Sequence, residues 1–274
     1  MRLRLRHETS YKYDTPARGA IQILRLTPRN HATQFVRRWR VEIDADCRLD
    51  RDEDAYGNIT HTFSIDGPID SMKITVDGEV DTSADAGVIT GSFERFPLAY
   101  WISDTPLTES DAAMREFAAD TAGQDGGDPL AYLHRLMKTI NENFAFDTEA
   151  THVATRAVDA FAAKAGVCQD YAQVFASAAR ARGIPARYVS GYYFRTDSDD
   201  QEAGHAWAEA HVDGVGWIGF DPANGACTDS RYIRVATGRD SLEASPIRGA
   251  RLGGFGEALG VKVHLSVGRE ISDQ

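Results

Sequence analysis

Two short segments late in the chain restrict the possible folds more than any other feature of the sequence. Residues 205–212, HAWAEAHV, place alanine or valine at every even position and a polar or aromatic side chain at every odd one. After a turn at 213–216, residues 217–221, WIGFD, again place apolar side chains, Ile218 and Phe220, at even positions. Because successive side chains of a strand point to opposite faces, this pattern predicts an antiparallel hairpin in which even positions share one face. The fold must therefore contain a sheet with an apolar side.

The same parity places His205 and Asp221 on the other face, at similar levels near the open end of the hairpin, since both lie about equally far from the turn. An imidazole beside a carboxylate is the arrangement that orients a catalytic base and stabilises its imidazolium form. A surface histidine and an aspartate that begins a turn before Pro222 would show the same pattern. Trp207 and Trp217 share this face, and we expect them to contact a substrate.

A cysteine, Cys168, follows Gly166 and begins an amphipathic segment. Apolar residues recur at the spacing of one helix face, at Ala172, Phe175, Ala176 and Ala179. A helix is predicted over 168–182, because the GIP sequence at 183–185 ends it. A thiol in the first turn lies close to unpaired N–H groups and to the positive end of the helix dipole, which favour the thiolate. We interpret Cys168 as a nucleophile and expect Gln169 to contact substrate, although an isolated cysteine is more often a small buried side chain.

The first 80 residues contain short alternating segments, at 2–7, 11–13, 20–27, 35–44, 58–65 and 72–80. Turn residues separate them, for example at 14–16 and 66–68. Short strands at this spacing predict an antiparallel sandwich or barrel. An apolar segment at 93–102 is interpreted as the crossing between an N-terminal β domain, 1–100, and a second domain, 101–274.

The second domain combines helical and strand patterns. Helices are predicted from 112, over 129–143 and over 157–164, and strands over 186–194 and 262–267. The last of these strands belongs to a C-terminal tail that we expect to flank the site. The fold class predicted for the whole chain is α+β, with a β-sandwich-like region ahead of a mixed domain.

Composition excludes several classes of function. No run approaches the roughly 20 apolar residues of a membrane helix, and the first seven residues, MRLRLRH, carry charge where a signal peptide is apolar. The formal net charge of −11 argues against nucleic acid as the main partner. Three scattered cysteines, Cys47, Cys168 and Cys227, suit neither a disulfide framework nor a zinc site. A cytoplasmic protein with no membrane association and no cofactor or metal is expected, and its oligomeric state is left open.

Four blocks of the sequence resemble the transglutaminase-like superfamily of papain-related cysteine enzymes. They are GVCQDYA at 166–172, RARGIPARYVSGYY at 180–193, HAWAEAHV at 205–212 and GWIGFDPANG at 216–225. The order of segments also resembles that of bacterial members with an N-terminal β region. The resemblance implies a core in which the nucleophile helix packs on an antiparallel sheet, and a triad of Cys168, His205 and Asp221. Ala162 stands where papain-type enzymes place an oxyanion glutamine, six residues before the cysteine, so the second oxyanion donor is unassigned.

These residues favour acyl transfer on amide or isopeptide bonds, with peptide or protein as substrate. Peptide or isopeptide hydrolysis is the preferred interpretation, because no amine-binding element is recognisable. A protein-glutamine crosslinking transglutaminase and an amidase remain open, as does a peptide-binding module with an unused triad. A metallohydrolase that uses His205, Glu209 and His211 is disfavoured, because side chains four and six positions apart on a strand spread over more than about 10 Å.

Overall fold

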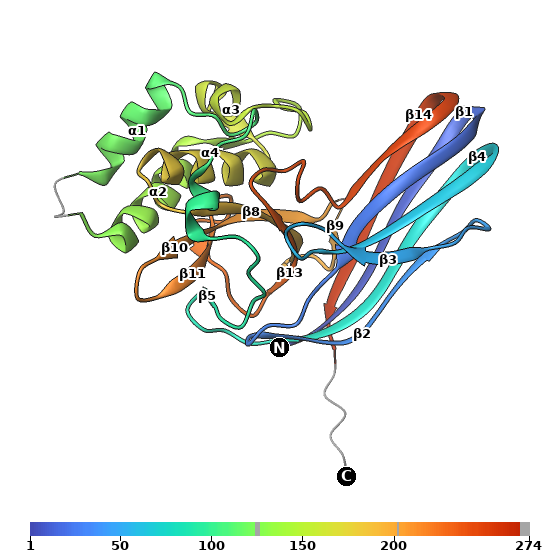
Figure 1. Ribbon diagram of the computed structural model, residues 1–274, viewed down its shortest axis with the longest axis horizontal. Helices are drawn as coiled ribbons and strands as arrows, with labels where there is room; N and C mark the ends of the chain where they lie inside the picture. Colours follow the sequence, from blue (N-terminus) through green and yellow to red (C-terminus); the bar gives the residue numbers. More distant parts are fainter. Residues whose placement is uncertain (124–126, 202, 269–274) are drawn as a thin grey trace, which may run out of the picture.

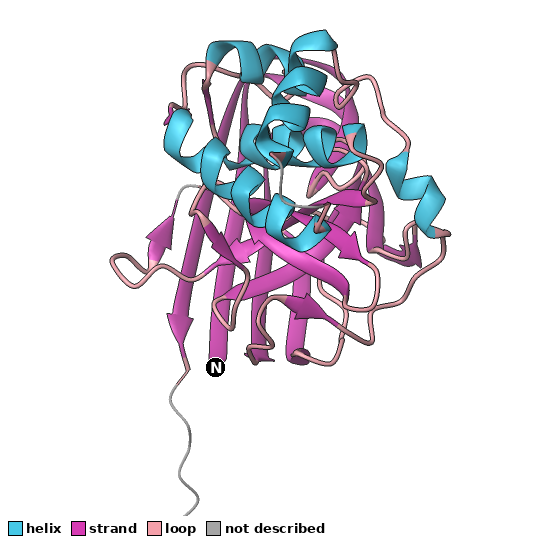
Figure 2. Ribbon diagram, turned by 90° about the vertical axis from the view of Figure 1, so that its left-hand side faces the viewer, coloured by secondary structure: helices cyan, strands magenta, loops and turns pink. Residues whose placement is uncertain are grey.

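The structure is a computed structural model that describes residues 1–123, 127–201 and 203–268. The first part of the chain contains β1 (Arg2–Thr27), β2 (Gln34–Ile43), β3 (Asp50–Glu53), β4 (Ile59–Thr82), β5 (Val88–Ile89), the 3-10 helix η1 (Leu98–Ile102), α1 (Ala112–Ala122) and α2 (Pro129–Asn143). The second part contains β6 (Ala145–Phe146), α3 (Ala157–Ala163), β7 (Ala165–Gly166), α4 (Cys168–Ala181), β8 (Ala186–Tyr193), β9 (Asp200–Gln201), β10 (His205–Val212), β11 (Gly216–Asp221), β12 (Ala226–Cys227), β13 (Tyr232–Gly238) and β14 (Ile247–Val267). The helices gather at one end of the molecule, over the second of two antiparallel sheets (Figure 2). This is the predicted α+β class.

Three unusually long strands, β1, β4 and β14, of 26, 24 and 21 residues, form the centre of the first sheet. The strand order is β2-β4-β1-β14-β9, and β3 adds to β4. The long strands bend back near their middles, at the end of the sheet farthest from the helices (Figure 1), and β1 shifts register against β4 between Lys12 and Ala17. Buried side chains of β1 lie at odd positions before the bend, as at Leu3, and at even positions after it, as at Leu24. Both halves turn an apolar face inward, which gives the predicted sandwich-like N-terminal region.

The C-terminal strand β14 completes this first sheet instead of belonging to the second one. It pairs with β1 over the whole length of both strands, from Leu3 opposite Val267 to Leu24 opposite Ile247. Conversely β5, from the N-terminal part of the chain, pairs with β11 of the second sheet. Both pairings cross the predicted boundary between 1–100 and 101–274, and the division into these two domains stays a prediction. β14 covers an edge of β1 that would otherwise expose unpaired backbone groups, and such long-range pairing leaves no local signal.

The second sheet has the order β12-β11-β10-β8-β13, with β5 on β11, and it carries the predicted hairpin. Ala208 lies opposite Phe220 and Ala210 opposite Ile218, so even positions face even positions as the sequence predicts. Helix α4 packs on this apolar face, where the rings of Phe175 and Phe220 stack with centroids 5.2 Å apart. The small alanines of β10 leave room for the helix.

The two sheets also pack against each other, and one cluster of buried side chains joins strands of the first sheet to β8 and β13 of the second. Its β8 members, Tyr188 and Tyr192, lie on the same face as Ala208. The opposite face, which carries Trp207 and Trp217, is buried as well. Within the described ranges no helix is long and apolar enough to cross a membrane. The cytoplasmic location stays a prediction.

Candidate active site

The hairpin holds an imidazole and a carboxylate in direct contact. Nε2 of His205, at the start of β10, lies 2.6 Å from Oδ2 of Asp221, at the end of β11. The predicted register is confirmed, because a slip by one residue would have turned the two side chains to opposite faces. Asp221 is fully buried, and the side chain of His205 is 13% exposed. A short hydrogen bond of this kind, shielded from water, holds the ring in one orientation.

Cys168 occupies the first position of α4, and the residues around it explain how the helix begins there. The buried carboxylate of Asp170, in the first turn, accepts hydrogen bonds from the amide of Val167 at 2.9 Å and from the hydroxyl of Thr151 at 2.6 Å. Gly166 has a φ of +153°, and a Cβ atom at this position would lie 2.5 Å from the Asp170 carboxylate. The glycine thus leaves room for the capping carboxylate, and the cap fixes where Cys168 leaves the turn.

Cys168 lies close enough to the imidazole of His205 to interact with it electrostatically, so the three groups come together at one place. Because Nε2 of His205 is engaged by Asp221, Nδ1 is the ring nitrogen available to the thiol. Burial alone would lower the pKa of His205, but the charge of Asp221, together with the electrostatic contribution of Cys168, raises it to about 10. The imidazole therefore holds its proton at neutral pH, next to the sulfur.

Two further side chains that the sequence pattern did not single out complete the environment of Asp221. Its Oδ2 accepts hydrogen bonds from Asn224 Nδ2 at 2.6 Å and from the hydroxyl of Tyr232 at 2.9 Å. Its Oδ1 accepts the amides of Ala223 and Asn224 at 3.0 and 3.2 Å. Burial would raise the pKa of Asp221, but the charge of His205 and these hydrogen bonds lower it, so the group stays a carboxylate.

Only one of these two partners leaves a trace in the sequence. Asn224 follows Asp221 by three residues in a turn, a spacing at which an asparagine often bonds a neighbouring polar group. Tyr232 lies 11 residues beyond Asp221 in another strand, and no local signal connects the two.

Comparison with known proteins assigns the chain to a family. Residues 115–222 match the model of the transglutaminase-like superfamily, and residues 3–81 match that of the bacterial transglutaminase-like N-terminal region. An uncharacterized protein of Mycobacterium tuberculosis is 30% identical over 275 residues, which cover 90% of this chain and 87% of the relative. The chain belongs to the transglutaminase-like superfamily.

Other members of the superfamily match the whole chain or its core. An uncharacterized protein of Mycobacterium leprae is 28% identical over 97% of this transglutaminase-like chain and 98% of the relative. A protein-glutamine gamma-glutamyltransferase of Pseudomonas aeruginosa is 32% identical over 117 residues, which cover 38% of this chain and 17% of that protein. The crystal structure of a candidate cysteine protease from Cytophaga hutchinsonii superposes with a TM-score of 0.79 at 18% identity, over 97% of this chain and 90% of that one. At that identity the superposition shows a shared fold.

The two tryptophans predicted to contact substrate are buried in this transglutaminase-like protein. Trp207 is 1% exposed and packs edge-on against Tyr232, with centroids 5.3 Å apart. Trp217 is 5% exposed, and the guanidinium of Arg187 lies 3.9 Å from its ring centroid. The face of the hairpin that they share is covered by neighbouring elements, and a contact of either ring with substrate stays a prediction. Gln169 is half-buried, with its Nε2 3.5 Å from Val153 O, and its contact with substrate stays a prediction.

Glu209, on the same face, lies at the centre of a buried ion-pair network. Its carboxylate is fully buried and meets Arg187 at 2.6 Å and Arg234 at 2.7 Å, and Arg187 also meets Glu94 at 2.8 Å. Burial would raise the pKa of Glu209, but the two guanidiniums hold it at about 2. With both oxygens engaged by arginine, Glu209 is not free to join His205 as a metal ligand. Among the described residues, no three His, Cys, Asp or Glu side chains are grouped closely enough to hold a metal ion.

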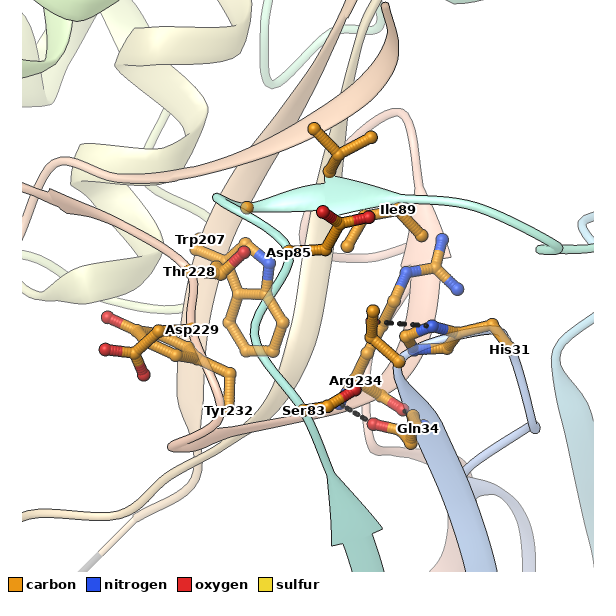
Figure 3. Close-up of a pocket in the computed structure, with 13 residues that line it drawn as sticks. His31, Gln34, Ser83, Asp85, Ile89, Trp207, Thr228, Asp229, Tyr232 and Arg234 are labelled. Atoms are coloured by element: carbon orange, nitrogen blue, oxygen red, sulfur yellow. Dashed lines mark hydrogen bonds between the residues drawn. The ribbon is translucent and has the colours of Figure 1, made fainter. Parts of the chain in front are cut away.

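A small cavity lies on the Trp207 side of the second sheet, where residues 31–34 and 83–89 cover it. Its volume is about 30 Å³, close to the space for a single water molecule. Trp207, Tyr232, His31 and Arg234 line it, and Figure 3 shows the two aromatic rings side by side on one wall. Neither Cys168 nor His205 is among its lining residues, so a substrate of this transglutaminase-like protein must approach from elsewhere.

Proposed function

We propose that the chain catalyses cysteine-dependent acyl transfer on amide or isopeptide bonds of a peptide or protein, most readily as a peptidase. One observation carries the proposal: Cys168, at a helix start, interacts with a histidine that is held at 2.6 Å by a buried carboxylate. This connectivity of nucleophile, base and orienting group is the arrangement that activates a thiol. Membership of the transglutaminase-like superfamily supports the same chemistry.

In the proposed reaction the Cys168 sulfur forms a bond with the substrate carbonyl carbon. The oxyanion that develops can be held by unpaired amides of the first turn of α4. When the C–N bond breaks, His205 gives its proton to the departing amine and a thioester remains on Cys168. Water or a second amine then attacks the thioester and loses a proton to His205, and the C–S bond breaks. This releases the acyl group and restores the thiolate of Cys168 beside the imidazolium. Asp221 stabilises the imidazolium throughout.

Hydrolysis and amine transfer share this thioester and differ only in the group that attacks it. Hydrolysis is favoured because no amine-binding element is recognisable, and the Cytophaga hutchinsonii protein with the same fold is described as a candidate protease. Transfer is the second candidate, because the matching region of the Pseudomonas aeruginosa relative belongs to a protein-glutamine gamma-glutamyltransferase.

A panel of peptides with glutamine side chains, isopeptide linkages and D-residue linkages, assayed with and without a primary amine, separates the candidates. Release of free amine from wild type but not from Cys168→Ser supports hydrolysis. Incorporation of the added amine supports transfer. A panel in which wild type and Cys168→Ser give equal product on every peptide would remove the catalytic proposal and favour a peptide-binding module.

The reactivity of the thiols tests the nucleophile without any substrate. Burial raises the pKa values of Cys227 and Cys47, with the charge of Asp46 adding to the effect at Cys47, so both thiols should react slowly at pH 7. We expect brief iodoacetamide treatment of native protein to label Cys168 first, as read by peptide mass mapping. His205→Gln should remove this preference. Labelling of Cys47 or Cys227 ahead of Cys168 would contradict the assignment.

A further inference from the structure

The hydroxyl of Tyr232 reaches the triad carboxylate across the width of the sheet. Tyr232 begins β13 and Asp221 ends β11, and β10 and β8 lie between these strands. The hydroxyl nevertheless lies 2.9 Å from Oδ2 of Asp221. The pKa of Tyr232 is raised by burial and by the charge of Asp221, so the phenol keeps its proton and donates it to the carboxylate.

Specific residues of the intervening strands make this contact possible. Gly191 of β8 lies opposite His205 of β10, and a Cβ atom at this position would lie 2.7 Å from the Trp207 ring and 2.1 Å from Ile233 O. The Trp207 ring therefore lies against a glycine, and the Tyr232 ring packs edge-on against it at 5.3 Å. Figure 3 shows Tyr232 beside Trp207 on the wall of the cavity. The phenol is 5% exposed, and its position is set by packing.

Tyr232 differs from the other hydrogen-bond donors to Asp221 in the part of the fold from which it comes. Apart from His205, the remaining donors are the amides of Ala223 and Asn224 and the side chain of Asn224, which all belong to the turn that follows Asp221. A carboxylate held only by its own turn can move with that turn. Tyr232 ties it to a strand on the far side of the sheet.

We propose that Tyr232 is a positioning residue, which holds the Asp221 carboxylate against His205 and so stabilises the imidazolium form of that histidine. This inference rests on the proposed function for its catalytic meaning, but its structural content can be tested without a substrate. The titratable groups that face His205 are Cys168 of α4, Asp221 of β11, and Tyr193 and Tyr232 from β8 and β13.

The test is the titration of His205 followed by NMR in protein labelled at histidine, with the signal assigned by its loss in His205→Gln. In Tyr232→Phe we expect the pKa of His205 to fall by about one unit, because the carboxylate is less firmly held and the imidazolium is less stabilised. Tyr132→Phe is the matched control. It removes another buried hydroxyl, one that donates to Ala178 O at 3.0 Å in the helical layer, and it should leave the titration unchanged.

Each outcome bears on the proposal. An unchanged pKa in Tyr232→Phe would show that Tyr232 only fills space, and a raised pKa would show that it competes with His205 for the carboxylate; either result overturns the positioning role. The proposed function fails separately, when wild type and Cys168→Ser give equal product on the peptide panel. If wild type is active, Tyr232→Phe should lower kcat about tenfold with little change in KM.

Discussion

Two carboxylates on neighbouring strands of one sheet are equally buried and are satisfied in different ways. Glu209 on β10 and Asp221 on β11 are both fully buried. Glu209 meets two guanidiniums, Arg187 and Arg234, which keep their charge at any pH the protein meets. Asp221 meets one cation that can give up its proton, the imidazolium of His205, and otherwise neutral donors.

This difference separates a structural carboxylate from one suited to catalysis. Around Glu209 every charge is compensated and no proton can move without breaking an ion pair, so the network links β8, β10 and β13 and does no chemistry. The cation that contacts Asp221 is an imidazolium, which can give its proton to a leaving group and take another back. Burial alone does not distinguish the two carboxylates; the identity of the cation does.

The largest expected effect comes from removing the charge of Asp221. Asp221→Asn keeps the shape of the side chain but no longer stabilises the imidazolium, and we expect kcat/KM on an active peptide to fall roughly 10² to 10⁴-fold. Asp213→Asn is the matched control, because Asp213 lies 3.6 Å from His211 on the same hairpin and its side chain is fully exposed. Activity of Asp221→Asn equal to that of the control would remove Asp221 from the mechanism.

The equivalent substitution of the other carboxylate, Glu209, should lower the stability of the fold. Glu209→Gln removes the carboxylate partner of the buried Arg234 and one of the two partners of Arg187, and we expect it to lower the free energy of unfolding by about 3 to 5 kcal/mol in urea titrations. Glu8→Gln removes a surface carboxylate that lies 2.7 Å from Arg6, and it should cost less than about 1 kcal/mol. Equal losses in the two variants would mean that the buried network is not what links the strands.

The smallest expected effects concern the pH dependence of the free energy of unfolding. Glu209 should affect it at acid pH and His205 at alkaline pH. The pKa of Glu209 is about 2 in the folded chain, below its ordinary value of 4.5, so its contribution is present above pH 4.5 and is lost as the pH falls toward 2. The pKa of His205 is about 10, above its ordinary 6.5, so its contribution is full below pH 6.5 and is lost as the pH rises to 10. Urea titrations across this range should show a flatter acid limb in Glu209→Gln and a flatter alkaline limb in His205→Gln. If both variants lost stability at acid and alkaline pH as wild type does, Glu209 and His205 would not be the groups that cause these losses.

Local periodicity carried most of the predicted fold. The hairpin, the start of α4 and the sandwich-like N-terminal region follow from alternation and helix-end signals, and these depend on a few neighbouring residues. The turn signals at 14–16 and 66–68 also correspond to a structural feature, since the register of the β1 and β4 pair is irregular around them. They mark a bend inside a long strand and not its end, because pairing with neighbouring strands continues on both sides.

The sequence by itself determined that His205 and Asp221 share a face and that Cys168 begins a helix, because side-chain parity and helix capping are properties of adjacent residues. Only the tertiary structure decided which elements cover that face. It buried Trp207 and Trp217 and brought Tyr232 over Gly191 to Asp221. It also joined the C-terminal strand to β1. The physical reason is that such contacts form between residues far apart in the chain, and their stability depends on how whole sheets pack, which no window of the sequence contains.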